Sequence, residues 1–241
     1  MVSDHTNLPF FPKYETDRLF DDKLSVTWFE TNFSQSHYNV HNISRGSNAC
    51  TLIAILVAAK CNKYKILINK PENCLTVKLV QVLALSMLEG NQIHENLKLN
   101  NKLKHINLNV PEAISFADKD TKGIVEWKNE VFMEPLAKSL YTNIRIHWRN
   151  WVKSQMNNEP SDLYLVLVAD ARTVLFIFQI RSETITLVDS HQHSAEKGAF
   201  IAIAHCSILK YLCEWYTKVL FKFNNSVPQL YELSFLYFKK S

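Results

Sequence analysis

The order of apolar and polar residues divides the chain into a helical first part and a strand-rich last third. The ten residues from Thr51 to Lys60, TLIAILVAAK, are apolar on almost every side, which is typical of a helix buried at the centre of a fold. Ser47 or Asn48 is the expected N-cap of this helix. Residues 75–99 carry apolar side chains at helical spacing. Further helices are predicted over Val131–Leu140, Ile144–Val152 and Phe200–Phe221.

Strand patterns dominate the last third. Nearly continuous apolar runs, joined by an Asp170-Ala171-Arg172 turn, predict three successive strands over Leu163–Ala169, Thr173–Ile180 and Glu183–Asp189. Two further strands are expected over Leu24–Thr31 and Tyr231–Phe238. Runs this apolar suit central strands of an antiparallel sheet covered on both faces. The order of elements predicts a single α+β domain over residues 1–241, with residues 1–23 as an extended arm.

Composition and charge narrow the class of protein. The net charge of +4, from 27 basic and 23 acidic residues, does not require a nucleic-acid or membrane partner. The chain has only 4 glycines, and no phosphate-binding glycine motif occurs. The aromatic run 147–151 could offer a base-stacking surface, but aromatics three residues apart on a helix more often pack in the core.

Cysteine usage and hydropathy indicate the compartment. The 5 cysteines fit neither a disulfide framework nor a paired metal motif. The first residues lack a signal-peptide pattern, and no apolar run approaches the roughly 20 residues of a membrane span. We therefore expect an intracellular protein, cytoplasmic or nuclear, with reduced thiols and neither a cofactor nor a metal.

Cys50 stands at the predicted start of the buried helix. A helix N-terminus carries partial positive charge and unpaired N–H groups, which favour a thiolate and can also hold an oxyanion. From position alone, a buried cysteine that acts as a small apolar residue is the more common case. The remaining cysteines are interpreted as such packing residues: Cys61, Cys74, Cys206 and Cys213.

The polar sequence V-D-S-H-Q-H, residues 188–193, ends the third of the successive strands. Asp189 and His191 are two residues apart, so both can point to the same side of an extended strand end. There the carboxylate would orient the imidazole, and the imidazole would accept the proton of a nucleophile. Alone, D-x-H is more often a turn capped by Asp189 and Ser190. A metal cluster is a third interpretation, although the motifs of catalytic zinc sites are missing; its further ligands would be His193, His205 and Cys206.

Taken together, a cysteine that leads a buried helix and a later D-x-H at a strand end resemble the papain-like cysteine peptidases. Within them, the resemblance is to the herpesvirus tegument deubiquitinases. In that family an apolar strand is followed by D-[SP]-H, a short polar loop and a small G-A segment; this chain has L-V-D-S-H-Q-H-S-A-E-K-G-A-F-I-A. Gln35 and Gly46 precede Cys50 in the family's order, and the family's G-x-Q-C becomes G-S-N-A-C.

This resemblance implies a papain-like fold and a thiol hydrolase that acts on ubiquitin or a ubiquitin-like protein. Cys50 would be the nucleophile, His191 the general base and Asp189 the orienting acid. The implied oxyanion-hole donor is Gln35, and the altered residues before the cysteine leave two alternatives, Asn42 and Asn48. Two other classes stay open: an inactive papain-like pseudoenzyme that serves as a protein-binding module, and a scaffold in which the cysteine only fills the core.

Overall fold

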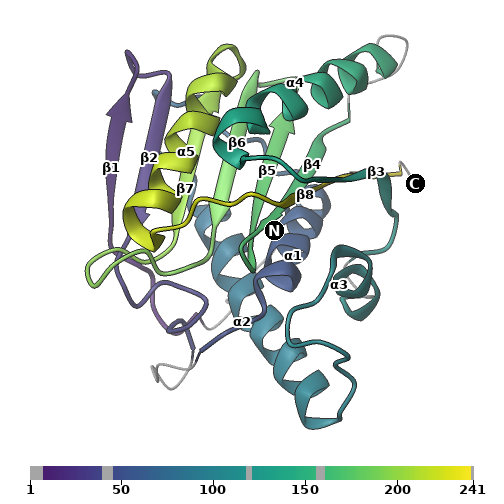
Figure 1. The fold of residues 1–241 in the computed structure, drawn as a ribbon. Coiled ribbons are helices and arrows are strands. Elements are labelled where there is room, and N and C mark those ends of the chain that lie inside the picture. The colour runs from purple at the N-terminus through teal and green to yellow at the C-terminus, as the bar shows by residue number, and fades with distance from the viewer. Residues whose placement is uncertain (1–7, 40–45, 118–120, 156–160, 240–241) are drawn as a thin grey trace.

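The computed structural model describes residues 8–39, 46–117, 121–155 and 161–239, and shows one large sheet with helices on both faces (Figure 1). In this part of the chain 8 strands pair in the order β1-β2-β7-β6-β5-β4-β8-β3, and every neighbouring pair is antiparallel. The strands are β1 (Tyr14–Leu19), β2 (Leu24–Phe29), β3 (Ile124–Phe132), β4 (Leu163–Ala169), β5 (Arg172–Gln179), β6 (Thr184–Asp189), β7 (Phe200–His205) and β8 (Tyr231–Phe238). The helices are α1 (Cys50–Lys63), α2 (Val77–Leu99), α3 (Val110–Phe116), α4 (Leu136–Ser154) and α5 (Leu209–Asn224), with a 3₁₀ turn η1 (Cys206–Ile208).

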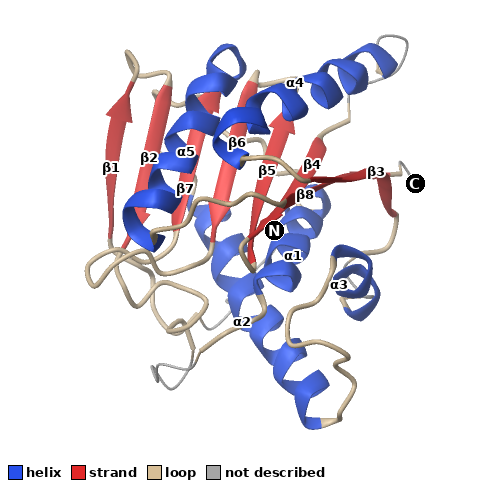
Figure 2. Cartoon of the chain, viewed as in Figure 1, coloured by secondary structure: helices blue, strands red, loops and turns tan. Residues whose placement is uncertain are grey.

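The sheet separates two apolar cores. One core joins it to α1, α2 and α3, and the other joins it to α4 and α5 (Figure 2). Side chains of β4 alternate between them: Tyr164 and Val166 belong to the first core, and Leu165 and Leu167 to the second. Because both faces are covered, both sets of side chains are apolar, which confirms the prediction of central antiparallel strands.

Helix α1 is buried at the centre of the first core. Every residue from Cys50 to Cys61 is buried, so the prediction of a central helix is confirmed. Helix α2 packs closely against it, because a Cβ at Gly90 would lie only 2.7 Å from Cγ1 of Ile53. This close approach fixes the position of α1 against α2 in the first core. No helix among the described residues is long and apolar enough to cross a membrane.

Several sequence predictions near the ends of elements are wrong. Residues 14–19, assigned to an N-terminal arm, form the edge strand β1 on β2. The helix predicted over Val131–Leu140 begins only at Leu136, because residues 131 and 132 still pair with β8. The helix predicted over Phe200–Phe221 is strand β7 followed by α5, since residues 200–205 pair between β2 and β6. An apolar run fits a buried strand as well as a buried helix, and here sheet pairing decides.

Candidate active site

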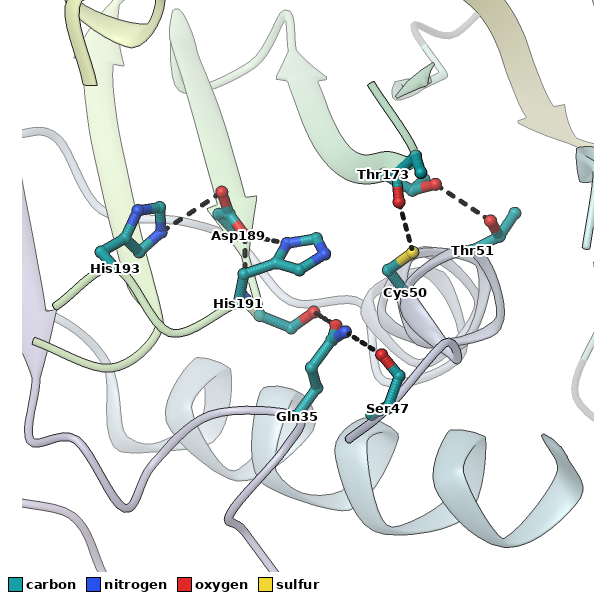
Figure 3. Close-up of polar contacts among 10 residues, drawn as sticks. Gln35, Ser47, Cys50, Thr51, Thr173, Asp189, His191 and His193 are labelled. Carbon is teal, nitrogen blue, oxygen red and sulfur yellow. Dashed lines mark hydrogen bonds and ion pairs between the residues drawn. The ribbon is translucent and has the colours of Figure 1, made fainter. Parts of the chain in front are cut away.

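Two elements that are distant in sequence meet at one end of the sheet. Cys50 is the first residue of α1, and Asp189 is the last residue of β6, with His191 just beyond it. The His191 ring points toward the Cys50 side chain (Figure 3). The structure thus brings together the three residues that the sequence singled out.

Asp189 orients His191 through one carboxylate oxygen. Its Oδ1 accepts a hydrogen bond from the backbone N–H of His191 at 2.9 Å and lies 2.6 Å from Nδ1 of the same residue. The Asp189 side chain is fully buried, so this contact is shielded from water. With Nδ1 engaged by the carboxylate, Nε2 is the ring nitrogen left to face the thiol.

The charges of this group favour a thiolate beside an imidazolium. Burial opposes ionisation, but the His191 imidazole lowers the pKa of Cys50 to about 7. Burial would also lower the pKa of His191, but the Asp189 carboxylate raises it to about 9. Against its own burial, the pKa of Asp189 is held well below its usual value by the two histidines His191 and His193. Between pH 7 and 9 the reactive thiolate is therefore accompanied by a protonated imidazole, as in activated cysteine nucleophiles.

The N-terminus of α1 adds backbone donors at Cys50. The N-cap is Ala49 rather than Ser47 or Asn48, and no side chain in the described part of the protein caps the first turn. The Ser47 hydroxyl instead accepts a hydrogen bond from the N–H of Ala49 at 3.2 Å. The N–H groups of a helix start, together with the helix dipole, suit an oxyanion that forms next to the thiol.

Gln35 is the oxyanion candidate that the structure places against the histidine segment. Its backbone N–H donates to the carbonyl of Ser190 at 2.7 Å, and its side chain lies below the His191 segment and the start of α1 (Figure 3). Asn48 is half-buried in the segment before Cys50. Asn42 lies outside the described residues.

Two residues at this site were not assigned to it from sequence. His193 is buried, and its Nε2 lies 3.3 Å from Oδ2 of Asp189, an ion-pair distance without hydrogen-bond alignment. In the sequence, the alternation D-x-H-x-H indicates His193 only as a possible metal ligand. Thr173 bonds the hydroxyl of Thr51 at 2.9 Å. Hydrogen bonds from Thr173 also lower the pKa of Cys50, and only burial and His191 affect that pKa more strongly. Nothing in the sequence marks Thr173.

The residues of the alternative chemistries lie elsewhere. His205 is the last residue of β7 and pairs with Thr184 at the start of β6, and Cys206 follows it, whereas Asp189 is at the other end of β6. Among the described residues no group of three or more His, Cys, Asp or Glu side chains is arranged to hold a metal. In the run 147–151, Trp148 and Trp151 pack against aromatic rings of the sheet, so they are core residues.

No protein-family model and no curated protein matches the sequence. A solved structure does resemble the fold: the ubiquitin-specific protease encoded by murine cytomegalovirus tegument protein M48, in complex with a ubiquitin-based suicide substrate. The TM-score is 0.50 at 13% sequence identity, and the match covers 88% of this chain and 86% of that chain. At this identity the likeness concerns the fold: a mixed α+β architecture with a large antiparallel sheet, shared with a viral ubiquitin-specific protease.

We expect alkylation of Cys50 by iodoacetamide to follow a pH curve with its midpoint near 7, the pKa of the thiol in the folded protein. Only the thiolate reacts, so the rate rises as the pH passes through that value. In His191→Ala the imidazolium is lost while burial remains. The midpoint should therefore move above the ordinary thiol value, and the rate at pH 7 should fall at least about tenfold.

Peptide-level mass spectrometry separates Cys50 from the other cysteines. Cys74 is exposed, contrary to its interpretation as a packing residue, so the measurement uses a Cys74→Ser background. Cys61 serves as an internal control, because burial raises its pKa to about 12. An unchanged midpoint in His191→Ala would show that the imidazole does not control the thiol.

Proposed function

We propose that this protein is a papain-like thiol hydrolase that cleaves the bond after the C-terminal glycine of ubiquitin or a ubiquitin-like protein. One observation carries the proposal. Cys50 at the head of a buried helix faces an imidazole that a buried carboxylate orients, and the pKa of the thiol falls to about 7 while that of His191 rises to about 9. This is the arrangement of a nucleophile, a base and an orienting acid.

The reaction follows from these roles. The Cys50 thiolate forms a bond to the carbonyl carbon of the C-terminal glycine, and the carbonyl oxygen takes the negative charge. Gln35 and the N–H groups at the start of α1 stabilise that oxyanion. His191 then gives its proton to the leaving lysine amine, and the C–N bond breaks to leave a thioester. His191 next accepts a proton from water, which attacks the thioester, and the Cys50 thiolate leaves. No cofactor or metal takes part.

The choice of ubiquitin rests on the fold. The M48 protease, which shares the α+β architecture, was solved with a ubiquitin-based suicide substrate. The order of cysteine, aspartate and histidine is also that of the herpesvirus tegument deubiquitinases, which the sequence resembles. A shared fold and a shared order of site residues favour a shared class of substrate.

Ubiquitin binding without hydrolysis is the second candidate function. Cys50 is only 4% exposed, so its side chain offers little surface to a substrate. The segment before it, G-S-N-A-C, also departs from the family's G-x-Q-C. A pseudoenzyme that keeps the fold as a binding module would have both features.

A ubiquitin-based assay tests the proposal. The expected result is release of a fluorophore from a ubiquitin C-terminal amide, together with one covalent adduct per chain with an electrophilic ubiquitin probe. Ubiquitin that lacks its last two glycines, with the same electrophile, is the matched control and should form no adduct. Binding of ubiquitin without adduct or hydrolysis would favour the binding module. If ubiquitin neither binds nor reacts, the substrate is wrongly assigned.

A further inference from the structure

The Gln35 side chain is held by residues on both sides of the candidate site. Its Oε1 accepts a hydrogen bond from the Ser190 hydroxyl at 2.7 Å, and its Nε2 donates to the carbonyl of Ser47 at 3.1 Å (Figure 3). Asn91 of α2 extends this network, since it donates to the Gln35 carbonyl at 2.7 Å and accepts from the Ser47 hydroxyl at 2.6 Å. Gln35 and Ser190 are each only 4% exposed.

The chemistry of these partners fixes which way the amide faces. A backbone carbonyl only accepts hydrogen bonds, so the Ser47 carbonyl requires the nitrogen of the Gln35 amide. The amide oxygen must then face Ser190, whose hydroxyl is able to donate to it. Ser47 engages one N–H of the amide. The second N–H, which the described residues do not engage, is left for an oxygen that develops on a substrate.

We propose that Ser190 is a positioning residue that orients the Gln35 amide, so that the segment carrying the general base also sets the oxyanion hole. The inference rests on the proposed function in taking Gln35 as the oxyanion donor. Ser190 lies between Asp189 and His191, so one short stretch of backbone places the acid, the base and the partner of the donor. An oxyanion donor contributes most when it is held in place before the reaction.

Removal of the Ser190 hydroxyl leaves the buried amide oxygen of Gln35 without its partner. A buried acceptor that loses its donor carries a penalty, which the amide relieves by turning toward other partners. The second N–H then no longer points to the developing oxyanion. The thiol and the imidazole keep their contacts, because the Ser190 hydroxyl bonds neither of them.

Two small reagents separate these effects without requiring ubiquitin. Acylation by p-nitrophenyl acetate joins the Cys50 sulfur to the acetyl carbon and passes through an oxyanion before nitrophenolate leaves. Alkylation by iodoacetamide displaces iodide at a saturated carbon and forms no oxyanion. Both rates are measured with the full chain. The rate of the corresponding Cys50→Ala protein is subtracted each time, which leaves the rate that depends on Cys50.

We expect Ser190→Ala to lower the acylation rate about tenfold and to leave the rate and pH profile of alkylation unchanged. Ser190→Thr keeps the hydroxyl and should restore acylation to within about threefold of the wild type. Gln35→Ala should lower acylation about a hundredfold. The double variant should be no slower than Gln35→Ala alone, because Ser190 acts through Gln35.

Other outcomes overturn the inference. Unchanged acylation in Ser190→Ala, or an equal fall in both reactions, removes the proposed role in the oxyanion hole. Additive losses in the double variant would mean that Ser190 acts independently of Gln35. Absence of acylation at Cys50 in the wild type would also overturn it. If acylation responds as expected while ubiquitin substrates are inert, only the proposed function fails.

Discussion

Replacing Cys50 by alanine is expected to abolish hydrolysis of a ubiquitin C-terminal amide, with a loss of about 10⁴-fold or more in kcat. Alanine cannot form the thioester, and water does not substitute for a thiol at the head of α1. The substitution removes a single sulfur atom, and alanine has the highest helix propensity for this first position of α1. The fold should therefore persist, which circular dichroism and thermal melting check.

Cys61→Ala is the matched control. It removes the same atom from the same helix, but burial raises the pKa of Cys61 to about 12, so this thiol has no thiolate to offer near neutral pH. Hydrolysis by Cys61→Ala should match the wild type. If Cys50→Ala retained more than a tenth of the wild-type rate, Cys50 would not be the nucleophile. Ubiquitin should still bind to Cys50→Ala, since binding surfaces do not depend on the sulfur.

Much of the candidate site is readable from the sequence because its signals are local. A cysteine that begins an apolar helix and a D-x-H at a strand end each depend on a few neighbouring residues. If the helix that begins at Cys50 packs on the centre of the sheet, its first residue can come close to the strand end that carries D-x-H. The choice among Gln35, Asn42 and Asn48 is different, because it depends on which loop reaches the end of β6. That contact, Gln35 to Ser190, joins residues 155 positions apart.

The fold was predicted best where burial is greatest. Strands β4, β5, β6 and β8 are buried along most of their length on both faces and rich in apolar or β-branched residues, so their sequence pattern is strong. Strand β7 was predicted as part of a helix, since only its position between β2 and β6 identifies it as a strand. Edge strands β1 and β3 are largely exposed or half-buried, so their residues resemble those of polar loops.

The same kind of long-range contact explains a glycine in the loop after the histidines. A Cβ at Gly198 would lie 2.3 Å from the carbonyl oxygen of Glu30 and 2.6 Å from that of Phe33. The next residue, Ala199, donates its N–H to the Phe33 carbonyl at 2.8 Å. The segment just before Gln35 thus packs against the loop that follows His191. Only glycine at position 198 leaves room for the two carbonyl oxygens. The candidate base His191 and the oxyanion candidate Gln35 are therefore joined twice, through Ser190 and through the loop at Gly198.

Replacing Asp189 by asparagine is expected to lower kcat/KM for the ubiquitin amide about a hundredfold at pH 7. Asparagine fills the same space but carries no charge, so the imidazolium of His191 loses its partner. The pKa of His191, about 9 in the wild type, is raised by that carboxylate against the effect of burial. Without the carboxylate it should fall below the ordinary value for histidine.

The shape of the pH profile provides the decisive measurement. In the wild type, kcat/KM should rise as the thiol ionises near pH 7 and fall as His191 loses its proton near pH 9. In Asp189→Asn the upper limb moves to lower pH, and the lower limb moves to higher pH because the thiolate loses its cation. The pH range in which the enzyme is active therefore narrows from both sides and does not simply move. Asp162→Asn is the control, since that carboxylate accepts from Gln179 at 2.7 Å, away from the site. An unchanged profile in Asp189→Asn would mean that Asp189 only supports the fold.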